Sequence, residues 1–510
     1  MRALISVYDK TALDEFAHGL AQLGVELVAS GGTAAALEAL GLPVTRVEEL
    51  TESPEMLGGR VKTLHPRIHA AILARRDDEA DLATLDEQGI EPFDLVCVNL
   101  YPFREVAARH GVVEEEAVEM IDVGGPSMLR GAAKNFAHVA PVCRPDQYGF
   151  VLDELRANGG LSVETRRQLA AEAFATTAAY EAAIAGWFAG RESFPDLLTL
   201  SFEKVTDLAY GENPHQGAAY YAEAGVRRHL LSLVTQLHGR ELSLINLYDL
   251  SCARLLVREF ELPACVIVKH ANPCGVAVGA TIEEAYGRAL AADPVSAFGM
   301  VCVLNRPVEA ELGRALAERF IDVLFAPGYD DEALAALKGK PNTRILLDRE
   351  RRRFDPGEKD YKRVLGGLLV QDRDWDIEDR ELMEVRCGRL DEAAWGDLLF
   401  AWRVCKHVSS NAIVLAKDLQ TIGIGAGQMS RVDAVRIAVG KARELGHDLH
   451  GAVLASDAFF PFPDGPKRAL EEGVTAIIQP GGSVRDDDVE AAVEQAGAAM
   501  VITARRHFRH

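Results

Sequence analysis

The first ~150 residues alternate short apolar runs with helical patterns, and this alternation constrains the fold more than any other feature. ALISV comes before a stretch that places Leu13, Phe16, Leu20 and Leu23 on one helical face, and VELVAS comes before TAAALEALG. FDLVCVNL and HVAPVC follow, each beside a helical stretch. Strands that alternate with helices in this way predict an α/β fold with a mainly parallel sheet.

The rest of the chain contains a weak internal repeat. VKHANPCGVAVG (268–279) resembles CKHVSSNAIVLA (405–416), and DPVSAFG (293–299) resembles SDAFFPF (456–462) more faintly. In each half a Lys-His pair lies beside an apolar run and is followed within a few residues by Asn. The repeat predicts two related halves.

Breaks in these patterns predict where the domains meet. Helical stretches run from about 145 to 189 and end at RESFPDLLTL, so we expect a boundary near residues 190–200. The charged stretch LDRERRRFDPGEKDYKR (347–363) is expected to be a surface connection before the second half. The predicted domains are residues 1–195, 201–365 and 366–510.

The composition excludes several classes of protein. A formal net charge of -22 disfavours extended nucleic-acid binding, because the chain would repel a polyanion. No run approaches the ~18 apolar residues of a membrane span, and Asp9 interrupts the N-terminus before a signal-peptide core could finish. We therefore predict a cytoplasmic protein without a nucleic-acid or membrane partner. The eight cysteines show no CxxC spacing and lie mostly in apolar runs, which predicts buried, reduced thiols.

Two acid-free segments indicate local pockets for small anions. Residues 60–76 hold five Lys or Arg and no acid, and residues 123–145 also contain no Asp or Glu. ASGGT and VGGPS each place a Gly-Gly turn before a helix, where backbone N–H groups bind anions well. An interaction face, or an ordinary strand-to-helix turn with a capping Ser or Thr, would give the same patterns. Together the segments predict a phosphate-bearing substrate.

The stretch VKHANPCG ends an apolar run with two basic residues that resist burial. The cation of Lys269 disfavours the charged form of the next side chain, so His270 is expected to be neutral and able to accept a proton. Both side chains reach one pocket only if the strand ends here, and Asn272-Pro273 is expected to end it.

The sequence lacks the full motif of three other classes of site. A zinc deaminase needs PCxxC, but Cys274 is followed by Gly-Val-Ala. His65 and His69 have the spacing of two metal ligands on a helix, but Pro66 lies between them and no third ligand is evident. GIGAG at 423–427 lacks the spacing of a dinucleotide fingerprint. A non-catalytic nucleotide sensor remains the alternative from another class.

Motifs along the whole chain resemble one family. SVYDKT, ASGGT, PEMLGGRVKTLHP, VNLYPF, IDVGG and AAKN resemble, in order, the N-terminal half of the bifunctional AICAR transformylase/IMP cyclohydrolases. YGENPHQ, VKHANPCG, DPVSAFG, APGY, SSN, IGIGAGQMSR, FFPFPD and the terminal RHFRH resemble the C-terminal half. The resemblance implies a methylglyoxal-synthase-like first domain followed by two cytidine-deaminase-like α/β subdomains.

The resemblance implies the last two steps of IMP synthesis. A formyl group moves from 10-formyltetrahydrofolate to AICAR, and the product then loses water as its ring closes. For ring closure the family pattern implies Lys62, Tyr101, Asp122 and Lys134 as catalytic residues. It implies that the nucleotide is held by Ser6, Lys10, Ser30, Gly32, Thr33, Arg60, Thr63 and Asn99.

For formyl transfer the family pattern implies Lys269, His270 and Asn411 as catalytic residues. The implied substrate-binding residues are Tyr210, Gly299, Asp322, Ser430, Arg431, Phe459, Arg506 and Phe508. The family also implies a homodimer with this pocket across the interface and no catalytic metal, and it allows a monovalent cation. One residue departs from the pattern: Ala209 stands before YGENPHQ, where family members usually have an Arg that meets the substrate phosphate. This departure predicts a weaker grip on AICAR, or a grip by other basic residues.

Overall fold

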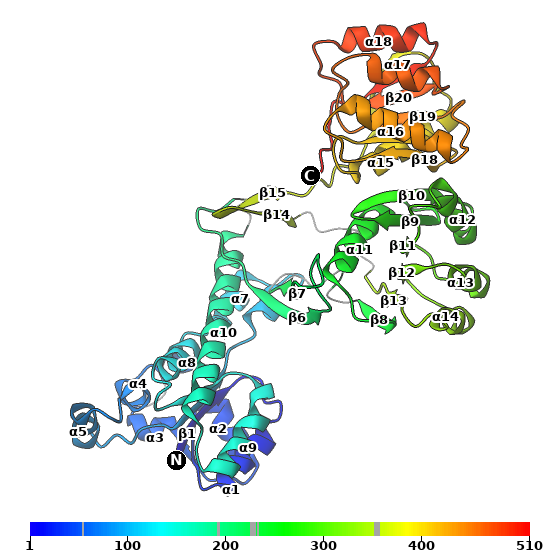
Figure 1. Cartoon of the computed structure of the whole chain (residues 1–510). Coiled ribbons are helices and arrows are strands. Elements are labelled where there is room, and N and C mark those ends of the chain that lie inside the picture. Colours follow the sequence, from blue (N-terminus) through cyan, green and yellow to red (C-terminus); the bar gives the residue numbers. More distant parts are fainter. Residues whose placement is uncertain (54–55, 191–193, 225–230, 232–233, 351–356) are drawn as a thin grey trace. The chain divides into compact units, whose positions relative to one another are not determined.

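A computed structural model describes the chain except for residues 54–55, 191–193, 225–230, 232–233 and 351–356 (Figure 1). Parts of PEMLGGRVKTLHP, of the predicted boundary near 190–200 and of the predicted connection at 347–363 therefore lie outside the described residues. The chain divides into two compact units. Unit 1 comprises 1–203 with 223–227, and unit 2 comprises 204–222 with 228–510.

Unit 1 contains a five-stranded sheet in the order β3-β2-β1-β4-β5, and every strand pair is parallel, which confirms the predicted sheet. Its strands are β1 (Arg2–Val7), β2 (Glu26–Ala29), β3 (Val44–Arg46), β4 (Leu95–Asn99) and β5 (Ala140–Val142). The chain order reverses between β1 and β4, so a crevice is expected at the carboxyl ends of these two strands.

Helices pack on both faces of this sheet. They are α1 (Leu13–Gln22), α2 (Gly31–Ala39), α3 (Val47–Thr51), α4 (Pro66–Leu73), α5 (Glu79–Glu87), α6 (Phe103–Ala107), α7 (Glu114–Glu119), α8 (Gly124–Lys134), α9 (Tyr148–Asn158) and α10 (Val163–Ala189). Phe16 and Leu20 of α1 join the core on one face, and Ile68 of α4 joins the core on the other. Leu23, predicted on the apolar face of α1, lies just beyond the helix and is exposed.

Unit 2 is built on a single twelve-stranded sheet in the order β16-β21-β20-β19-β17-β18-β10-β9-β11-β12-β13-β8. The strands are β8 (Thr235–His238), β9 (Ala264–Lys269), β10 (Asn272–Val278), β11 (Met300–Leu304), β12 (Ile321–Ala326), β13 (Arg344–Leu347), β16 (Glu384–Cys387), β17 (Ile413–Lys417), β18 (Gln420–Gly425), β19 (Val453–Ser456), β20 (Ala476–Gln479) and β21 (Ala499–Ile502). Its helices are α11 (Leu244–Val257), α12 (Ile282–Ala292), α13 (Ala310–Ala317), α14 (Asp331–Lys338), α15 (Glu392–Lys406), α16 (Arg431–Glu444), α17 (Asp464–Glu471) and α18 (Asp486–Gln495).

Two further pairs of strands lie in the described part of the chain. β6 (Phe202–Leu208) pairs with β7 (Ala218–Glu223), and β14 (Lys359–Val364) pairs with β15 (Gly367–Asp372). The predicted division between residues 365 and 366 falls in the turn of the second hairpin.

The sheet of unit 2 consists of two halves with the same topology. In each half an antiparallel hairpin, β9-β10 or β17-β18, is followed outward by one antiparallel strand, two parallel strands and a final antiparallel strand. The halves meet where β10 pairs with β18 at the centre of the sheet. The predicted internal duplication is therefore present.

The predicted alignment of the two halves was wrong. The strand equivalent to β9 is β17, so Lys269 and His270 correspond to Lys417 and Asp418, whereas the Lys-His pair at 406–407 lies at the end of α15. DPVSAFG lies before β11, but SDAFFPF follows the equivalent strand β19. Short motif similarity misled because Lys-His recurs at a helix end, where it serves another purpose.

The predicted end of the first strand was also wrong in detail. β9 ends at Lys269, the chain reverses at His270 and Ala271, and Asn272-Pro273 begin β10. His270 and Ala271 have φ values of 51° and 61°, which are the left-handed values that a two-residue hairpin turn requires. Pro273 is tolerated because β10 is irregular between Pro273 and Gly275.

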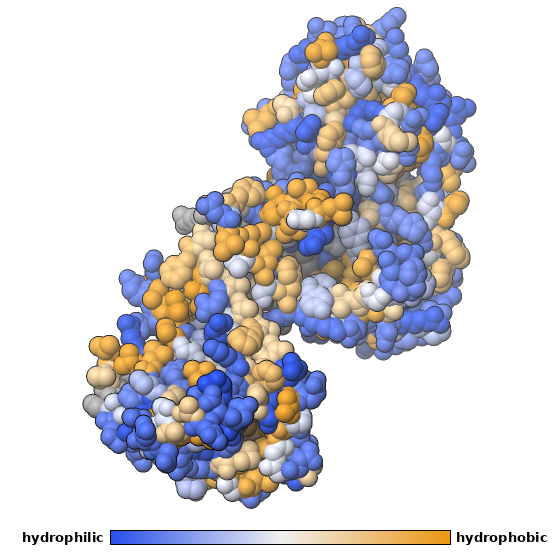
Figure 2. Space-filling view, turned by 60° about the vertical axis from the view of Figure 1, so that its left-hand side comes forward, coloured by the Kyte–Doolittle hydropathy of each residue, from blue (hydrophilic) through white to orange (hydrophobic). Residues whose placement is uncertain are grey.

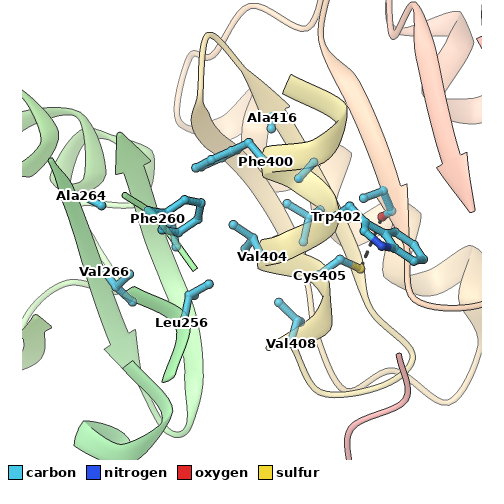
Figure 3. Packing of buried hydrophobic residues seen from close by; sticks show 14 of the residues in the cluster. Leu256, Phe260, Ala264, Val266, Phe400, Trp402, Val404, Cys405, Val408 and Ala416 are labelled. Atoms are coloured by element: carbon cyan, nitrogen blue, oxygen red, sulfur yellow. Dashed lines mark hydrogen bonds between the residues drawn. The ribbon is translucent and has the colours of Figure 1, made fainter. Parts of the chain in front are cut away.

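A shared hydrophobic core joins the two halves of unit 2. Leu256 and Phe260 from the first half belong to the same buried cluster as Phe400, Trp402 and Val404 of α15 (Figure 3). All eight cysteines are free, and six of them are buried. No helix in the described part of the chain is long and apolar enough to cross a membrane.

Candidate active sites

A cavity of about 540 Å³ opens in unit 1 at the carboxyl ends of β1 and β4. The volume is in the usual range for a small-molecule site, about 300–1,000 Å³. Its lining includes every residue predicted for ring closure except Lys134, namely Ser6, Lys10, Ser30, Gly32, Thr33, Arg60, Lys62, Thr63, Asn99, Tyr101 and Asp122. The fold thus brings residues from five separate motifs to one place.

Close packing explains why glycines stand beside this cavity. A Cβ atom on Gly31, whose φ is +50°, would lie 2.5 Å from the Lys62 Nζ atom. A Cβ atom on Gly124 would lie 2.4 Å from Thr63 Oγ1, and one on Gly125 would lie 2.3 Å from the Asp122 carboxylate. The absence of side chains therefore lets Lys62 and Asp122 approach the N-termini of α2 and α8, where backbone N–H groups favour an anion.

Asp122 and Tyr101 form the titratable centre of the cavity. The Asp122 carboxylate accepts a hydrogen bond of 2.8 Å from Gly125 N and another from the Tyr101 backbone. Burial nevertheless raises the pKa of Asp122, while these hydrogen bonds and the charge of Lys62 oppose the rise. Burial, with the Asp122 charge, also raises the pKa of Tyr101, so its hydroxyl is neutral near pH 7.

Some predicted nucleotide ligands also support the fold. Thr33 Oγ1 bonds both the N–H and the C=O of Val7 at 3.0 Å. Asn99 Oδ1 accepts from Tyr8 N at 2.6 Å and from Asp9 N at 3.0 Å. These two side chains fix the loop after β1, whereas the Arg60 guanidinium pairs with Glu119 at the rim.

Lys134 is not brought into this cavity. It is the last residue of α8, ten residues after Gly124 at the cavity end, and this spacing corresponds to about 15 Å along a helix. Its side chain is exposed. A catalytic role for Lys134 within one chain therefore has no geometric support.

The two histidines of RVKTLHPRIH serve the local backbone. His65 caps α4 by accepting a hydrogen bond from Arg67 N at 3.2 Å. His69 bonds the Thr63 backbone, although burial lowers its pKa. Among the described residues, no group of three or more His, Cys, Asp or Glu side chains is placed to hold a metal ion.

The residues predicted for formyl transfer lie along one edge of the twelve-stranded sheet. This edge holds the end of β9 and the starts of β11, β12 and β13 in the first half. Because β10 pairs antiparallel with β18, the same edge also holds the start of β17 and the ends of β18, β19 and β21. Located there are Lys269, His270, Gly299, Asp322, Asn411, Ser430, Phe459, Arg506 and Phe508.

His270 is exposed and lines a cavity of about 220 Å³ with Lys269, Asn272 and Asp293. The Lys269 ammonium donates to the backbone oxygens of Phe298 at 3.0 Å and Gly299 at 2.8 Å. Gly299 has a φ of +68°, and a Cβ atom there would lie 3.0 Å from Lys269 Nζ. The imidazole thus remains accessible while the lysine is anchored beside it.

Asn411 is held by a buried polar network. Its Oδ1 atom accepts from Arg431 at 2.6 Å, and its Nδ2 atom donates to Gln428 O at 2.8 Å. Arg431 pairs with the fully buried Asp457, which also accepts from Ser410. Arg431 therefore links Asn411 to Asp457, and Ser430 is the N-cap of α16.

The C-terminal segment is ordered along the same edge. His507 N donates to Asp457 O at 3.1 Å, and the Arg506 guanidinium lies 4.6 Å from the ring centre of Phe508. Phe459 and Phe508 keep 39% and 44% of their surface exposed, which leaves aromatic faces for a flat heterocycle.

Tyr210 and Asp322 lie beside two arginines. The Ala209-Tyr210 backbone is bonded to Leu242 and Leu244, next to Arg240 in the loop after β8. The Arg344 charge interacts with Asp322, Tyr210 and Arg240, and burial lowers its pKa. Only the Nε atom of Arg344 has a hydrogen bond among the described residues, to Glu241 O at 2.8 Å.

Sequence reasoning missed several contacts around the residues predicted for formyl transfer. Asp249 accepts from Ala271 N at 2.7 Å, and Asn272 accepts from Ser409 N at 2.8 Å. Arg509 reaches Ala271 O from the other end of the chain. Asn272 lies in VKHANPCG and Arg509 in RHFRH, but neither motif indicates these contacts, because the partners lie 22 to 238 positions away.

Comparisons with known proteins agree with this geometry. A family model described as AICARFT/IMPCHase bienzyme matches residues 132–441, and one described as MGS-like domain matches residues 12–127. The bifunctional purine biosynthesis protein PurH of Acidithiobacillus ferrooxidans is 50% identical, over 100% of this chain and 99% of that protein. PurH of Magnetococcus marinus is 49% identical with the same coverage.

Among solved structures, one titled "Crystal structure of ForH" is 43% identical and covers 37% of this chain and 96% of its own, with a TM-score of 0.34. The full-length relatives and the two family models lead to one conclusion. The chain belongs to the AICARFT/IMPCHase bienzyme family and is a bifunctional enzyme of the last two steps of IMP biosynthesis, formyl transfer to AICAR and ring closure to IMP.

Proposed function

We propose that the cavity of unit 1 closes the purine ring. The carboxamide nitrogen of formyl-AICAR forms a bond to the formyl carbon, and water then leaves. An amide is a weak nucleophile, so the site must take up a proton and stabilise charge on the formyl oxygen. The observation that supports this assignment is the convergence of Lys62, Tyr101 and Asp122 on one nucleotide-sized cavity.

Each of these residues has a chemical role in the proposal. Lys62, packed on Gly31 at the N-terminus of α2, stabilises the developing oxyanion. Asp122 accepts the amide proton, and its raised pKa makes it a better base than an ordinary aspartate. Tyr101 donates a hydrogen bond through its neutral hydroxyl.

We propose that the edge of the sheet in unit 2 transfers the formyl group from 10-formyltetrahydrofolate. The 5-amino nitrogen of AICAR attacks the formyl carbon and gives its proton to His270. The folate nitrogen leaves with a proton as the carbon–nitrogen bond breaks. Asn411 orients the formyl donor, and Lys269 assists at its carbonyl oxygen. His270 is well placed because its ring is accessible while its backbone is fixed.

The grip on the nucleotide phosphate in unit 2 is assigned to Arg344 and Arg240. Arg344 interacts with both Tyr210 and Arg240, and Ala209 supplies no charge there. In the described part of the chain neither arginine has a carboxylate partner within ion-pair distance, so both keep charge for a ligand.

A second copy of the chain is proposed to complete the formyl-transfer site. The 220 Å³ cavity at His270 is small for two substrates, and it is not lined by Tyr210, Asn411 or Phe508. Apolar residues also remain on the surface (Figure 2), among them Leu365, Leu368 and Leu369 of the β14-β15 hairpin, and such patches favour association. A monovalent cation and a cytoplasmic location remain predictions from the sequence.

A crossover experiment tests the two assignments. His270→Ala is expected to abolish formyl transfer but to leave ring closure of added formyl-AICAR unchanged. Asp122→Asn should do the reverse, with kcat for ring closure lowered by about 10²–10⁴-fold. If either variant lost both activities while folded, the assignment of one activity to each unit would be wrong.

A further inference from the structure

The turn that carries His270 has a backbone conformation that needs support. His270 and Ala271 both have positive φ values, which L-residues other than Gly, Asn and Asp rarely adopt. A single such residue is disfavoured, and here two are adjacent. The direction of the imidazole depends on this conformation, because His270 is the first residue of the two-residue turn.

Both backbone groups of Ala271 are bonded to side chains from distant segments. Its N–H donates to Asp249 of α11 at 2.7 Å. Its C=O accepts from Arg509 at 3.2 Å, across 238 positions of sequence. The turn is therefore clamped from two sides, by a helix of the first half and by the C-terminal segment.

Arg509 also connects this turn with the segment of Asn411. Its guanidinium donates to His407 O and, at 2.7 Å, to the Cys252 sulfur. Its backbone bonds Ser410 in both directions, with Ser410 N to Arg509 O at 2.9 Å and Arg509 N to Ser410 Oγ at 3.2 Å. Ser410 directly precedes Asn411. One residue thus contacts both segments that carry the proposed catalytic groups of unit 2, through its guanidinium at Ala271 and His407 and through its backbone at Ser410.

Arg509 does not line the cavity at His270. We propose that Arg509 is a positioning residue for formyl transfer, which holds the left-handed turn and keeps His270 and Asn411 in register. The proposal rests on the proposed role of His270. The planar guanidinium holds its donors in a fixed fork that reaches Ala271 O, His407 O and the Cys252 sulfur, and the compact ammonium of a lysine does not reproduce that spacing.

Arg288 of α12 provides a matched control, because its side chain contacts the other hairpin turn. It donates to the backbone oxygen of Asp418 in the equivalent turn, and to Val278 O at 2.7 Å. Arg509→Met is expected to lower kcat for formyl transfer by about 10–100-fold, since small misplacements of catalytic groups have effects of this size. The KM for each substrate should change less than about twofold. Arg288→Met should leave both constants unchanged.

Two further variants separate positioning from a loss of folding. Arg509→Lys should recover only part of the activity. Ala271→Gly, added to Arg509→Met, should recover part as well, because Gly adopts positive φ without the steric conflict of a Cβ atom. Thermal unfolding of each variant reports the folded fraction.

The proposal is overturned if folded Arg509→Met keeps the kcat of the original chain, or if its KM rises while kcat is unchanged, because Arg509 would then contact substrate. His270→Ala is measured in parallel. If that variant keeps its activity, the proposed role of His270 fails, and the result is distinct from a failure of Arg509 alone.

Discussion

The two hairpin turns of unit 2 share a backbone but not a chemistry. Each has two left-handed residues, His270 and Ala271 in the first half and Asp418 and Leu419 in the second. In each, an aspartate at the sixth position of the preceding helix caps the turn, Asp249 in α11 and Asp397 in α15.

The difference lies in the side chain and in the edge of the sheet. The first turn presents an imidazole on the edge where the other residues predicted for formyl transfer lie, while the second presents a carboxylate on the opposite edge. The duplicated frame therefore fixes a backbone conformation, and the residue placed on it decides which chemical group the turn presents.

The largest effect is expected when the first turn is given the side chain of the second. His270→Asp should fold, because Asp tolerates the left-handed region, and should lower kcat for formyl transfer by about 10²–10⁴-fold. Asp418→Ala should leave formyl transfer unchanged. Steady-state kinetics with AICAR and the folate donor measure both. A His270→Asp variant with near-normal turnover would refute the assigned base.

The next largest effect is expected on stability at low pH, because Glu259 of the first half of unit 2 contacts Lys406 and His407 of the second. Burial alone would raise the pKa of Glu259, but its contacts with His407 and Lys406 lower the pKa to about 2, from an ordinary value of 4.5. The ionised carboxylate therefore contributes stability above pH 4.5, and this contribution is lost as the pH falls towards 2. Denaturant unfolding as a function of pH should show a loss on the order of a few kcal/mol.

Glu259→Gln is the control for this pH dependence. The variant should be less stable than the original chain at pH 7, and its stability should change less between pH 4.5 and 2. Equal acid slopes for the two proteins would show that Glu259 does not carry the effect.

The second turn should matter for stability alone. Asp397 accepts from Asp418 N at 2.8 Å and from Leu419 N at 2.6 Å. Asp397→Ala leaves these partly buried hydrogen bonds without their acceptor and should lower the free energy of unfolding by about 1 kcal/mol. The kcat of formyl transfer should stay constant. A fall in kcat without a fall in stability would mean that the halves are catalytically coupled.

The smallest effect is expected at the edge of the first half. Ala209→Arg adds a cation beside Arg240 and Arg344, and should lower the KM for AICAR by roughly tenfold at most, or about 1.4 kcal/mol. The KM of the unphosphorylated nucleoside should not change. An unchanged KM for AICAR would count against a phosphate at this position.

The prediction of the parallel sheet in unit 1 was based on hydrophobic periodicity and local turn signals. Family motifs carried the grouping of Lys62, Tyr101 and Asp122, which the cavity brings together. Arg509 lies within the terminal motif RHFRH, but neither approach predicted its contacts or those of Asp249, because these depend on strand order and not on neighbouring residues. The alignment of the halves failed for the same reason, since Lys406 is part of a helix end and not of a hairpin.

The junction of the sheet in unit 2 has a consequence for how such a chain can change. β10 and β18 are equivalent strands that pair antiparallel, so the halves are related by a local two-fold axis, as subunits are in an isologous dimer. In a dimer of identical chains every substitution appears twice. Covalent fusion removes that constraint, and one copy can keep an imidazole while its counterpart carries an acid.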